Sequence, residues 1–203
     1  NKYLDFLGLQ HLRVRAVKIQ QKPFLENVIS NSDYRFLKTC LKDAGNYQWY
    51  FVVWFLGATG ARVSELIKLK VEHVEEGHFD IYSKGGKLRR LYIPKKLREE
   101  ALSWLRERGR KSGYLFVNRY GRTITPRGIS QQLKKYARKY SIEESVVCPH
   151  SFRHLFAKNF LERYNDIALL ADLMGHESIE TTKIYLRRTA NEQRAIVDRV
   201  VTW

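Results

Sequence analysis

The sequence predicts a mainly α-helical domain with one small antiparallel β-sheet, an α+β fold. Three observations support this prediction. The chain has 203 residues, 44% of them hydrophobic, which is enough apolar material for one sizeable core. Apolar residues recur with the helical period through most of the chain. Between residues 78 and 94 the pattern changes to strand-like segments separated by glycines.

The first elements are expected to be helices. SDYRFLKTCLKDAG predicts a helix that begins with the capping Ser32 and ends at Gly45. The next segment, YQWYFVVWFLGATG, is apolar nearly all round, which is typical of a buried helix. A third helix is predicted to begin near Arg62, in RVSELIKL. Residues 1–22 lack such a pattern, and we interpret them as a linker or the tail of a missing N-terminal domain, with the folded domain over residues 23–189.

The middle of the chain predicts a β-hairpin. The segments HFDIYS and LRRLYIP have strand-like composition, Gly85 and Gly86 form the turn between them, and Pro94 ends the second strand. Helical periodicity then returns for the rest of the chain. The further helices are predicted at residues 95–108, 126–140, 151–163, 166–174, 178–187 and 190–201.

The charge balance indicates a polyanionic partner. The chain has 37 Lys and Arg against 21 Asp and Glu, a formal net charge of +16, which favours nucleic acid over a membrane surface. No apolar run is long enough to span a bilayer and no signal peptide is visible, so we expect a cytoplasmic or nucleoid-associated protein without a membrane partner. Cys40 and Cys148 form neither a disulfide framework nor a metal-ligand spacing, which fits a reducing compartment.

A first candidate anion site lies in ATGARVSEL. On a helical wheel Arg62 falls inside the apolar arc that includes Val63 and Leu66, so this arginine must be paired or bound to an anion. A structural ion pair with Glu65, three residues on, is one interpretation. The other is that Glu65 holds the guanidinium while the rest of its fork binds a ligand.

A second cluster lies in PHSFRHLF. After Pro149, which suits a first helical turn, His150, Arg153 and His154 fall at positions i, i+3 and i+4 on one helix face. A lone histidine here would be explained by core packing, but this cluster on a cationic chain favours a phosphate or another oxyanion. Because no carboxylate belongs to the motif, a metal site or a Ser/His/Asp triad is poorly supported.

A third segment, LADLMGHESIETTKIYL, carries a glycine, a histidine and a tyrosine. Gly175 is predicted to cap a helix, and His176 lies in the turn that follows. Tyr185 comes nine residues after His176, on a second short helix. Taken alone, Tyr185 is most simply explained as a packed surface residue.

Together, ATGARVSEL, HSFRH and MGHESIETTKIY, in this order and spacing, resemble the catalytic domain of the tyrosine recombinases, the phage integrase family, over residues 24–190. The resemblance implies roles for the matching residues. Arg62 and Arg153 would hold the scissile phosphate, and Tyr185 would attack phosphorus to give a 3′-phosphotyrosine. The remaining residues that it implies are the paired histidines His150 and His176, the acidic Glu65 and the supporting His154.

The resemblance also implies a lysine in the hairpin turn that acts as general acid toward the leaving 5′ oxygen. In SKGGK this residue would be Lys84. Ser83 stands where the family more commonly has glycine, so Lys87 is kept as the alternative.

The chemistry of these residue types agrees with that assignment. Two forked guanidiniums neutralise a phosphodiester and stabilise the charge that builds in the transition state. A tyrosine, whose ordinary pKa is about 10, needs a proton acceptor or a strongly positive site at neutral pH. Either His150 or His176 is suited to this. Because the covalent intermediate conserves the phosphodiester bond energy, no nucleotide is expected, and because the arginines supply the electrostatic stabilisation, no metal or other cofactor is expected.

We therefore expect a site-specific recombinase or integrase that acts on double-stranded DNA as a homo-oligomer, from dimer to tetramer. A topoisomerase-like nicking and rejoining enzyme, and a non-catalytic DNA-binding domain of the same fold, are the alternatives. The apolar stripe in residues 190–203 is expected to dock on a neighbouring protomer, and the missing N-terminal domain is expected to bind DNA. The side chains expected to contact DNA are Lys87, Arg89, Arg127, Gln131, Lys134, Lys135 and Arg138.

Overall fold

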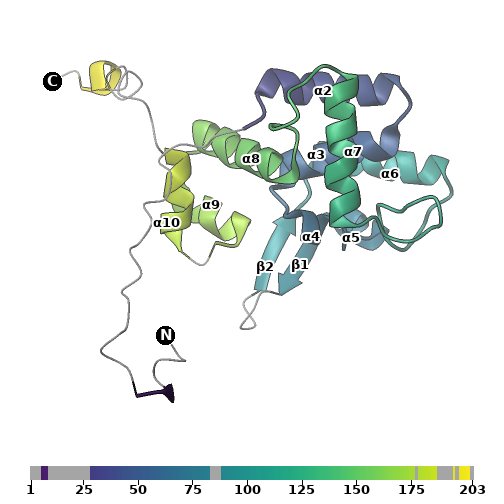
Figure 1. Cartoon of the computed structure of the whole chain (residues 1–203), viewed down its shortest axis with the longest axis horizontal. Helices are drawn as coiled ribbons and strands as arrows, with labels where there is room; N and C mark the ends of the chain where they lie inside the picture. The colour runs from purple at the N-terminus through teal and green to yellow at the C-terminus, as the bar shows by residue number, and fades with distance from the viewer. Residues whose placement is uncertain are drawn as a thin grey trace.

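A computed structural model of the chain describes residues 6–8, 28–82, 88–176, 178–186, 194 and 197–201. Its architecture is the predicted one, mostly helical with a single two-stranded antiparallel sheet among the described residues. The longer helices form the body of the molecule (Figure 1). They are α2 (Asn31–Asp43), α3 (Tyr47–Thr59), α6 (Lys95–Glu107), α7 (Pro126–Lys139) and α8 (Pro149–Arg163).

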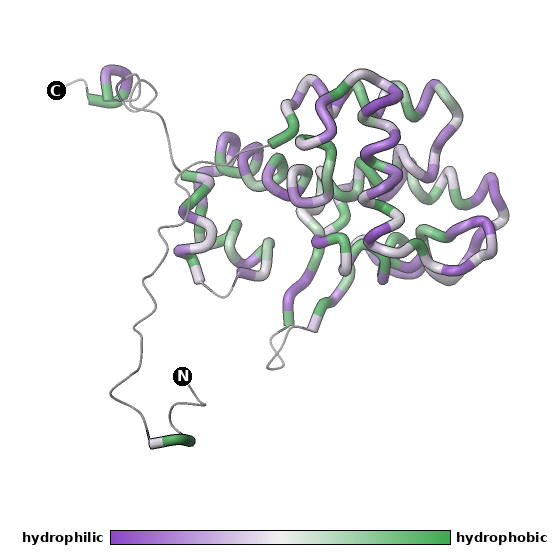
Figure 2. The backbone as a smooth tube through the Cα atoms, viewed as in Figure 1, coloured by the Kyte–Doolittle hydropathy of each residue, from purple (hydrophilic) through white to green (hydrophobic). Residues whose placement is uncertain are grey.

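Helix α3 forms the centre of the core, as its apolar sequence predicts. Val52, Phe55 and Leu56 have no exposed surface, and the helix packs between α2 and α8. The hydropathy colouring in Figure 2 shows α3 as largely apolar, whereas α2 and α7 alternate between polar and apolar residues. A helix that is apolar all round is stable only when neighbours cover every side of it. The other helices therefore enclose α3.

The predicted hairpin is present. Strand β1 (His78–Tyr82) pairs antiparallel with β2 (Leu88–Tyr92), with Ile81 opposite Arg89. Side chains of β2 alternate between exposed and buried, as expected for a strand with one covered face. Residues 83–87, which include the predicted turn with Lys84 and Lys87, lie outside the described residues.

Short helices at one end of the molecule complete the fold (Figure 1). A small apolar cluster that includes Leu161 of α8 and Met174 of α9 joins these two helices, and α9 also packs beside β2. The ring of Tyr185 packs against this cluster. The elements at this end are α9 (Ile167–Met174), α10 (Ile179–Thr182) and the 3-10 helix η2 (Lys183–Leu186).

Several element boundaries differ from prediction. Helix α2 is capped by Ser30, whose hydroxyl accepts from the Asp33 amide, and not by Ser32. The expected single helix at 178–187 is divided into α10 and η2. Of the predicted C-terminal helix, residues 197–200 are helical and exposed. The expected boundary between residues 22 and 23 lies outside the described residues.

The helix predicted from RVSELIKL is shorter than expected. Helix α4 covers only Val63–Leu66: the amides of Lys68 and Leu69 donate to carbonyls three residues back, and the carbonyl of Leu69 accepts from the Leu115 amide at 2.8 Å. A further short helix, α5 (Val71–Glu76), was not predicted and ends at Gly77. Within the described ranges, none of the helices has both the length and the apolar character needed to cross a lipid bilayer.

Candidate active site

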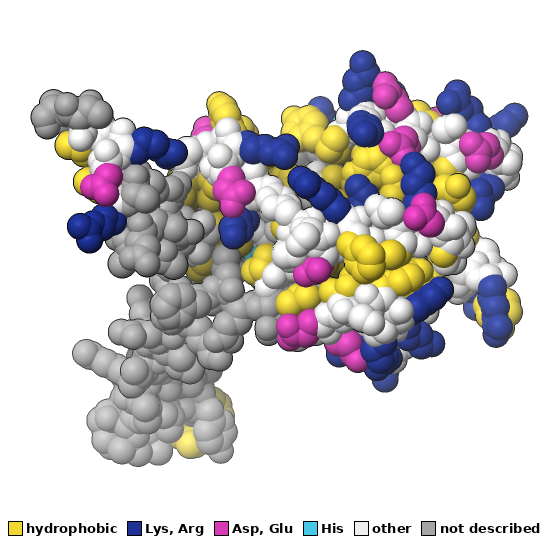
Figure 3. Space-filling view, turned by 90° about the horizontal axis from the view of Figure 1, so that it is seen from above, with side chains coloured by type: hydrophobic (Ala, Val, Ile, Leu, Met, Phe, Trp, Pro, Cys, Tyr) yellow, Lys and Arg dark blue, Asp and Glu magenta, His cyan; other side chains and the backbone are white. Residues whose placement is uncertain are grey.

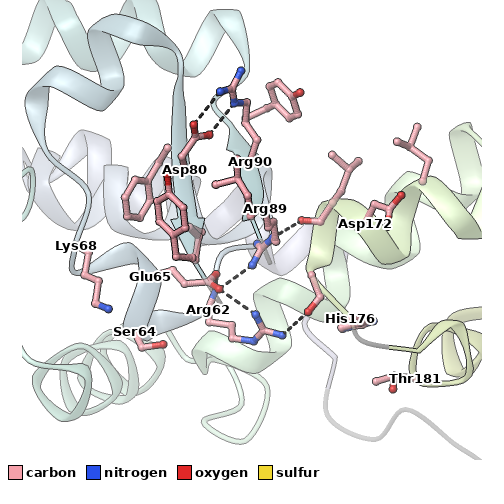
Figure 4. A pocket seen from close by; sticks show the side chains of 18 residues that line it. Arg62, Ser64, Glu65, Lys68, Asp80, Arg89, Arg90, Asp172, His176 and Thr181 are labelled. Carbon is pink, nitrogen blue, oxygen red and sulfur yellow. Dashed lines mark hydrogen bonds and ion pairs between the residues drawn. The ribbon is translucent and has the colours of Figure 1, made fainter. Parts of the chain in front are cut away.

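The first predicted motif forms an ion-pair network around Glu65 (Figure 4). Its Oε2 accepts the backbone amide of Arg62 at 2.7 Å, which caps α4. Its Oε1 accepts from Nη1 of Arg62 at 2.9 Å and from Nη1 of Arg89 at 2.7 Å. Burial by itself raises the pKa of Glu65, but Arg89 and the donors of Arg62 outweigh it and lower that pKa below its ordinary value. Glu65 is therefore an anion at neutral pH.

Three arginines donate to three successive carbonyl oxygens at the end of α9. The last carbonyls of a helix have no partner within it and carry partial negative charge, so cations are favourable there. The arginines come from the start of α4, from β2 and from α8. The pairs are Arg89 Nε to Leu173 O at 2.8 Å, Arg153 Nη2 to Met174 O at 2.6 Å and Arg62 Nη2 to Gly175 O at 3.1 Å.

Arg153 is the buried cation of the second motif, with only 6% of its surface exposed. Its Nη1 also donates to the carbonyl of Gly60 at 2.5 Å. Gly60 has φ of 63°, and a Cβ there would lie 2.5 Å from the ring of Phe156. Only glycine therefore allows the backbone at residue 60 to lie this close to Phe156 of α8. Burial and the neighbouring Arg62 lower the pKa of Arg153 to about 10. Arg153 thus stays charged at neutral pH.

His176 is a neutral imidazole between two partners. Its Nε2 lies 3.1 Å from Nη2 of Arg153, and its Nδ1 lies 2.7 Å from the hydroxyl of Thr182. Because a guanidinium can only donate, Nε2 accepts and Nδ1 carries the proton. Burial, followed by the charge of Arg153, lowers the pKa of His176 to about 4. Thr182, which is fully buried, was not predicted as part of the site.

Tyr185 is bound to His154. Its hydroxyl lies 2.8 Å from Nδ1 of His154, one turn along α8 from His150. Burial raises the pKa of Tyr185 to about 12, although Arg153 opposes this shift. Burial, with His150 and Arg153 nearby, lowers the pKa of His154. At neutral pH a neutral phenol therefore faces a neutral imidazole, and the hydroxyl can donate to Nδ1.

An open pocket of about 950 Å³ lies between the hairpin and α9 (Figure 4). Arg62 and His176 line it, whereas Arg153, His154 and Tyr185 do not; Arg153 adjoins it through its contact with His176. Among the residues that the structure describes, no group of three or more His, Cys, Asp or Glu side chains is placed to hold a metal ion.

The residues predicted to contact DNA fall into three groups. Lys87 lies outside the described residues. Arg89 is not on the open surface: it is 7% exposed, lines the pocket, and its guanidinium donates to Glu65 and to the Leu173 carbonyl of α9. Basic side chains are spread over the face in Figure 3. The five predicted residues of α7, all exposed, are Arg127, Gln131, Lys134, Lys135 and Arg138.

His150 lies in the first turn of α8 and is exposed, unlike Arg153 three residues later. The predicted cluster therefore divides between solvent and interior. His150 faces water, Arg153 lies in the interior, and His154 is half-buried against Tyr185.

Comparison with known proteins places this arrangement in a family. The model described as the phage integrase family matches residues 28–192. The chain is 41% identical to the tyrosine recombinase XerA of Pyrococcus furiosus over 154 residues. This alignment covers 73% of this chain and 53% of that protein. It is 36% identical to XerA of Pyrococcus horikoshii over 204 residues, and this alignment covers 97% of this chain and 69% of that protein. The chain thus spans between about half and two thirds of these relatives.

Solved structures agree in fold. A crystal structure of XerA recombinase superposes with a TM-score of 0.74 at 23% identity, over 99% of this chain and 72% of that one. The Tn1549 transposon integrase in complex with transposon right end DNA gives 0.69 at 19% identity, over 92% of this chain and 69% of that one. At these identities the similarity concerns the fold alone.

Proposed function

Because the chain belongs to the phage integrase family, we propose that it is the catalytic part of a site-specific recombinase that cuts and rejoins double-stranded DNA through a 3′-phosphotyrosine. One observation carries the proposal. Two guanidiniums and a neutral imidazole meet at the end of α9, and the hydroxyl of Tyr185, about 120 residues from Arg62 in sequence, is bound to His154, the residue after Arg153. This combination suits phosphoryl transfer, in which catalysis is mostly positioning and charge stabilisation.

In the proposed reaction, Tyr185 is the nucleophile. Its phenolic oxygen forms a bond to the scissile phosphorus, and the bond from phosphorus to the 5′ oxygen breaks. The phenolic proton passes to Nδ1 of His154, which lies 2.8 Å away and is neutral. Because burial raises the pKa of Tyr185 to about 12, the phenol needs such an acceptor at neutral pH. The attacking hydroxyl must leave His154 as the bond to phosphorus forms.

Arg62 and Arg153 are proposed to bind the non-bridging phosphate oxygens. The side chain of Arg62 is 42% exposed and lines the pocket, so it can meet DNA directly. Arg153 has five N–H donors and uses some of them on Gly60 and Met174. His176 accepts from Arg153 and so fixes the plane of this guanidinium.

Two further roles rest on the family resemblance. Lys84 is proposed to give its proton to the leaving 5′ oxygen, with Lys87 as the alternative; both lie outside the described residues. His150, exposed at the start of α8, is proposed to flank the phosphate. No step of the proposal is assigned to a metal.

The recombinase is proposed to act as a homo-oligomer on DNA. Val197 and Val200 are each 55% exposed, and Val201 is 47% exposed. This apolar stripe supports docking of residues 190–203 on a neighbouring protomer. The exposed basic side chains of α7 support binding to the DNA backbone, because phosphate contacts come mainly from lysine and arginine.

The test is covalent capture. The chain is incubated with a pool of nicked duplexes of randomised sequence, from which a short 5′ end diffuses away after cleavage. The parent protein should form a protein–DNA adduct that survives denaturation and yields a phosphotyrosyl peptide, and Tyr185→Phe should form none. Chelator should not reduce the yield. An adduct that persists in Tyr185→Phe would show that the nucleophile is wrong, and supercoil relaxation without recombinant product would favour a topoisomerase.

A further inference from the structure

Arg89 lies at the centre of the site without belonging to the predicted catalytic set. It is on β2, and its side chain is 6% exposed. Nη1 donates to Glu65 of α4 at 2.7 Å, and Nε donates to the carbonyl of Leu173 in α9 at 2.8 Å. One guanidinium thus holds together a strand and two helices. Through Glu65 Oε1 it also shares an acceptor with Arg62.

Arg89 is buried to the same degree as Arg153, but two of its three guanidinium nitrogens are committed to Glu65 and Leu173. Its remaining nitrogen, Nη2, is buried and has no hydrogen-bond partner among the described residues. An unpaired buried donor is costly, so a side chain that only filled space here would be better apolar. The position therefore requires the forked guanidinium, and the two partners that the fork binds, Glu65 and Leu173, belong to the protein.

We propose that Arg89 is a positioning residue that fixes the phosphate-binding side chains, an inference that rests on the proposed function. By holding Glu65, it sets the carboxylate to which Arg62 is bound. By holding Leu173, it sets the last turn of α9, from which the chain continues to His176. The side chains of Arg62 and His176 line the same pocket and take their positions from one buried guanidinium.

The backbone around Arg89 is shaped to this contact. Gly175, the residue before His176, has φ of 62°, and a Cβ added to it would lie 2.4 Å from Cδ of Arg89. The absence of a side chain therefore lets the backbone of the loop rest on the arginine stem. Strand β2 also directly follows residues 83–87, the segment of the proposed acid Lys84. Arg89 therefore connects strand β2 to helices α4 and α9, which carry Glu65 and Leu173.

The test compares three variants of the 203-residue chain. Arg89→Met keeps the stem and removes the guanidinium. Arg89→Lys keeps a charge beside Glu65 but has one nitrogen, which cannot reproduce the fork between Glu65 and Leu173. Arg90→Met is the matched control for folding, because Arg90 is adjacent and pairs with Asp80 within the hairpin, at 2.7 and 2.8 Å. Each variant is measured for DNA affinity, for the single-turnover rate of adduct formation at saturating DNA, and for amide hydrogen exchange over residues 171–176.

Arg89→Met should form adduct on the order of 100-fold more slowly, because small displacements of catalytic groups cost about that much, while its dissociation constant for DNA changes less than about threefold. The rate of adduct formation in Arg89→Lys should lie between that of Arg89→Met and that of the parent. If Arg89→Met fails to fold, this lysine variant tests the proposal. Exchange at the end of α9 should accelerate in Arg89→Met and stay slow in Arg90→Met.

An adduct rate equal to the parent's in Arg89→Met would overturn the inference. So would a loss of DNA affinity as large as the loss of rate, which would make Arg89 a binding residue. If the parent itself forms no adduct, the proposed function fails separately. Hydrogen exchange then decides the inference alone, because unchanged protection at the end of α9 in Arg89→Met would refute positioning.

Discussion

Replacing Glu65 with alanine should remove a large part of the stability of this fold. Glu65 is 7% exposed, and its two oxygens accept three hydrogen bonds. Without it, Arg89 is left as a buried charge with no counter-charge, because its side chain is only 6% exposed. Removing one partner of a buried ion pair costs about 3–5 kcal/mol, and the lost cap on α4 adds about 1 kcal/mol. A domain has only about 5–15 kcal/mol in total.

The assay is urea unfolding at pH 7, followed by circular dichroism and by tryptophan fluorescence. Glu162→Ala is the matched control, since Glu162 faces Lys158 at 3.9 Å on the exposed surface of α8. It should change the free energy of unfolding by less than about 0.5 kcal/mol. If Glu65→Ala unfolds within about 1 kcal/mol of the parent, the reasoning from the buried ion pair is refuted.

The ion pair of Glu65 should also make the stability of the fold fall as the pH is lowered. Because the fold lowers the pKa of Glu65 below its ordinary value of 4.5, its stabilising effect is fully present above 4.5 and is lost as pH falls through the lowered value. Glu65→Gln keeps the shape but not the charge. Its stability should therefore fall less steeply than the parent's on acidification below about pH 4.5. Equal slopes would mean that Glu65 does not titrate as an ion pair.

Three other outcomes are expected. Gly175→Ala should lower the free energy of unfolding by at least about 1 kcal/mol, because residue 175 has a φ of 62°. It should also slow adduct formation, because the added Cβ displaces the side chain of Arg89. Unchanged thermal unfolding would contradict this prediction. Since the pKa of His176 is lowered from 6.5 to about 4, stability should decline as pH falls from about 6.5 toward 4, and His176→Gln should flatten that decline in urea titrations. Because the chain has a net charge of +16, its affinity for DNA, measured by fluorescence anisotropy, should fall by about three orders of magnitude between roughly 50 and 200 mM salt. An affinity that does not change over this range would mean that the basic surface does not bind the DNA backbone.

Local patterns were sufficient for most of the fold. Helix α3 was predictable because its apolar residues cover every side of the helix, and the hairpin because two strand-like segments flank Gly85 and Gly86. Helix α4 was predicted too long because the residues after it bond to a distant segment, as the Leu115 amide does to the Leu69 carbonyl. No periodicity within eight residues reports such a partner.

The candidate site was predictable to the extent that its residues form compact motifs. Arg62 and Glu65 are three residues apart, so their spacing alone indicated the ion pair that the structure contains. The partners of Arg89 could not be predicted, because Glu65 and Leu173 are 24 and 84 residues away and a basic residue in a hairpin is typical of a DNA contact. An inward-facing position in β2, opposite Ile81, was the one available signal.

The end of α9 explains how this site holds its arginines before DNA arrives. Arg62, Arg89 and Arg153 face a single carboxylate, Glu65, so ion pairing alone leaves positive charge in excess. Three carbonyl dipoles of α9 offset part of it, and the remainder adds to the effect of burial in lowering the pKa of His176. A phosphate gains further negative charge in the transition state, and the dipoles can reorient little because they belong to a helix. In the proposed reaction, this excess positive charge is therefore available, without reorganisation, as negative charge builds on the phosphate.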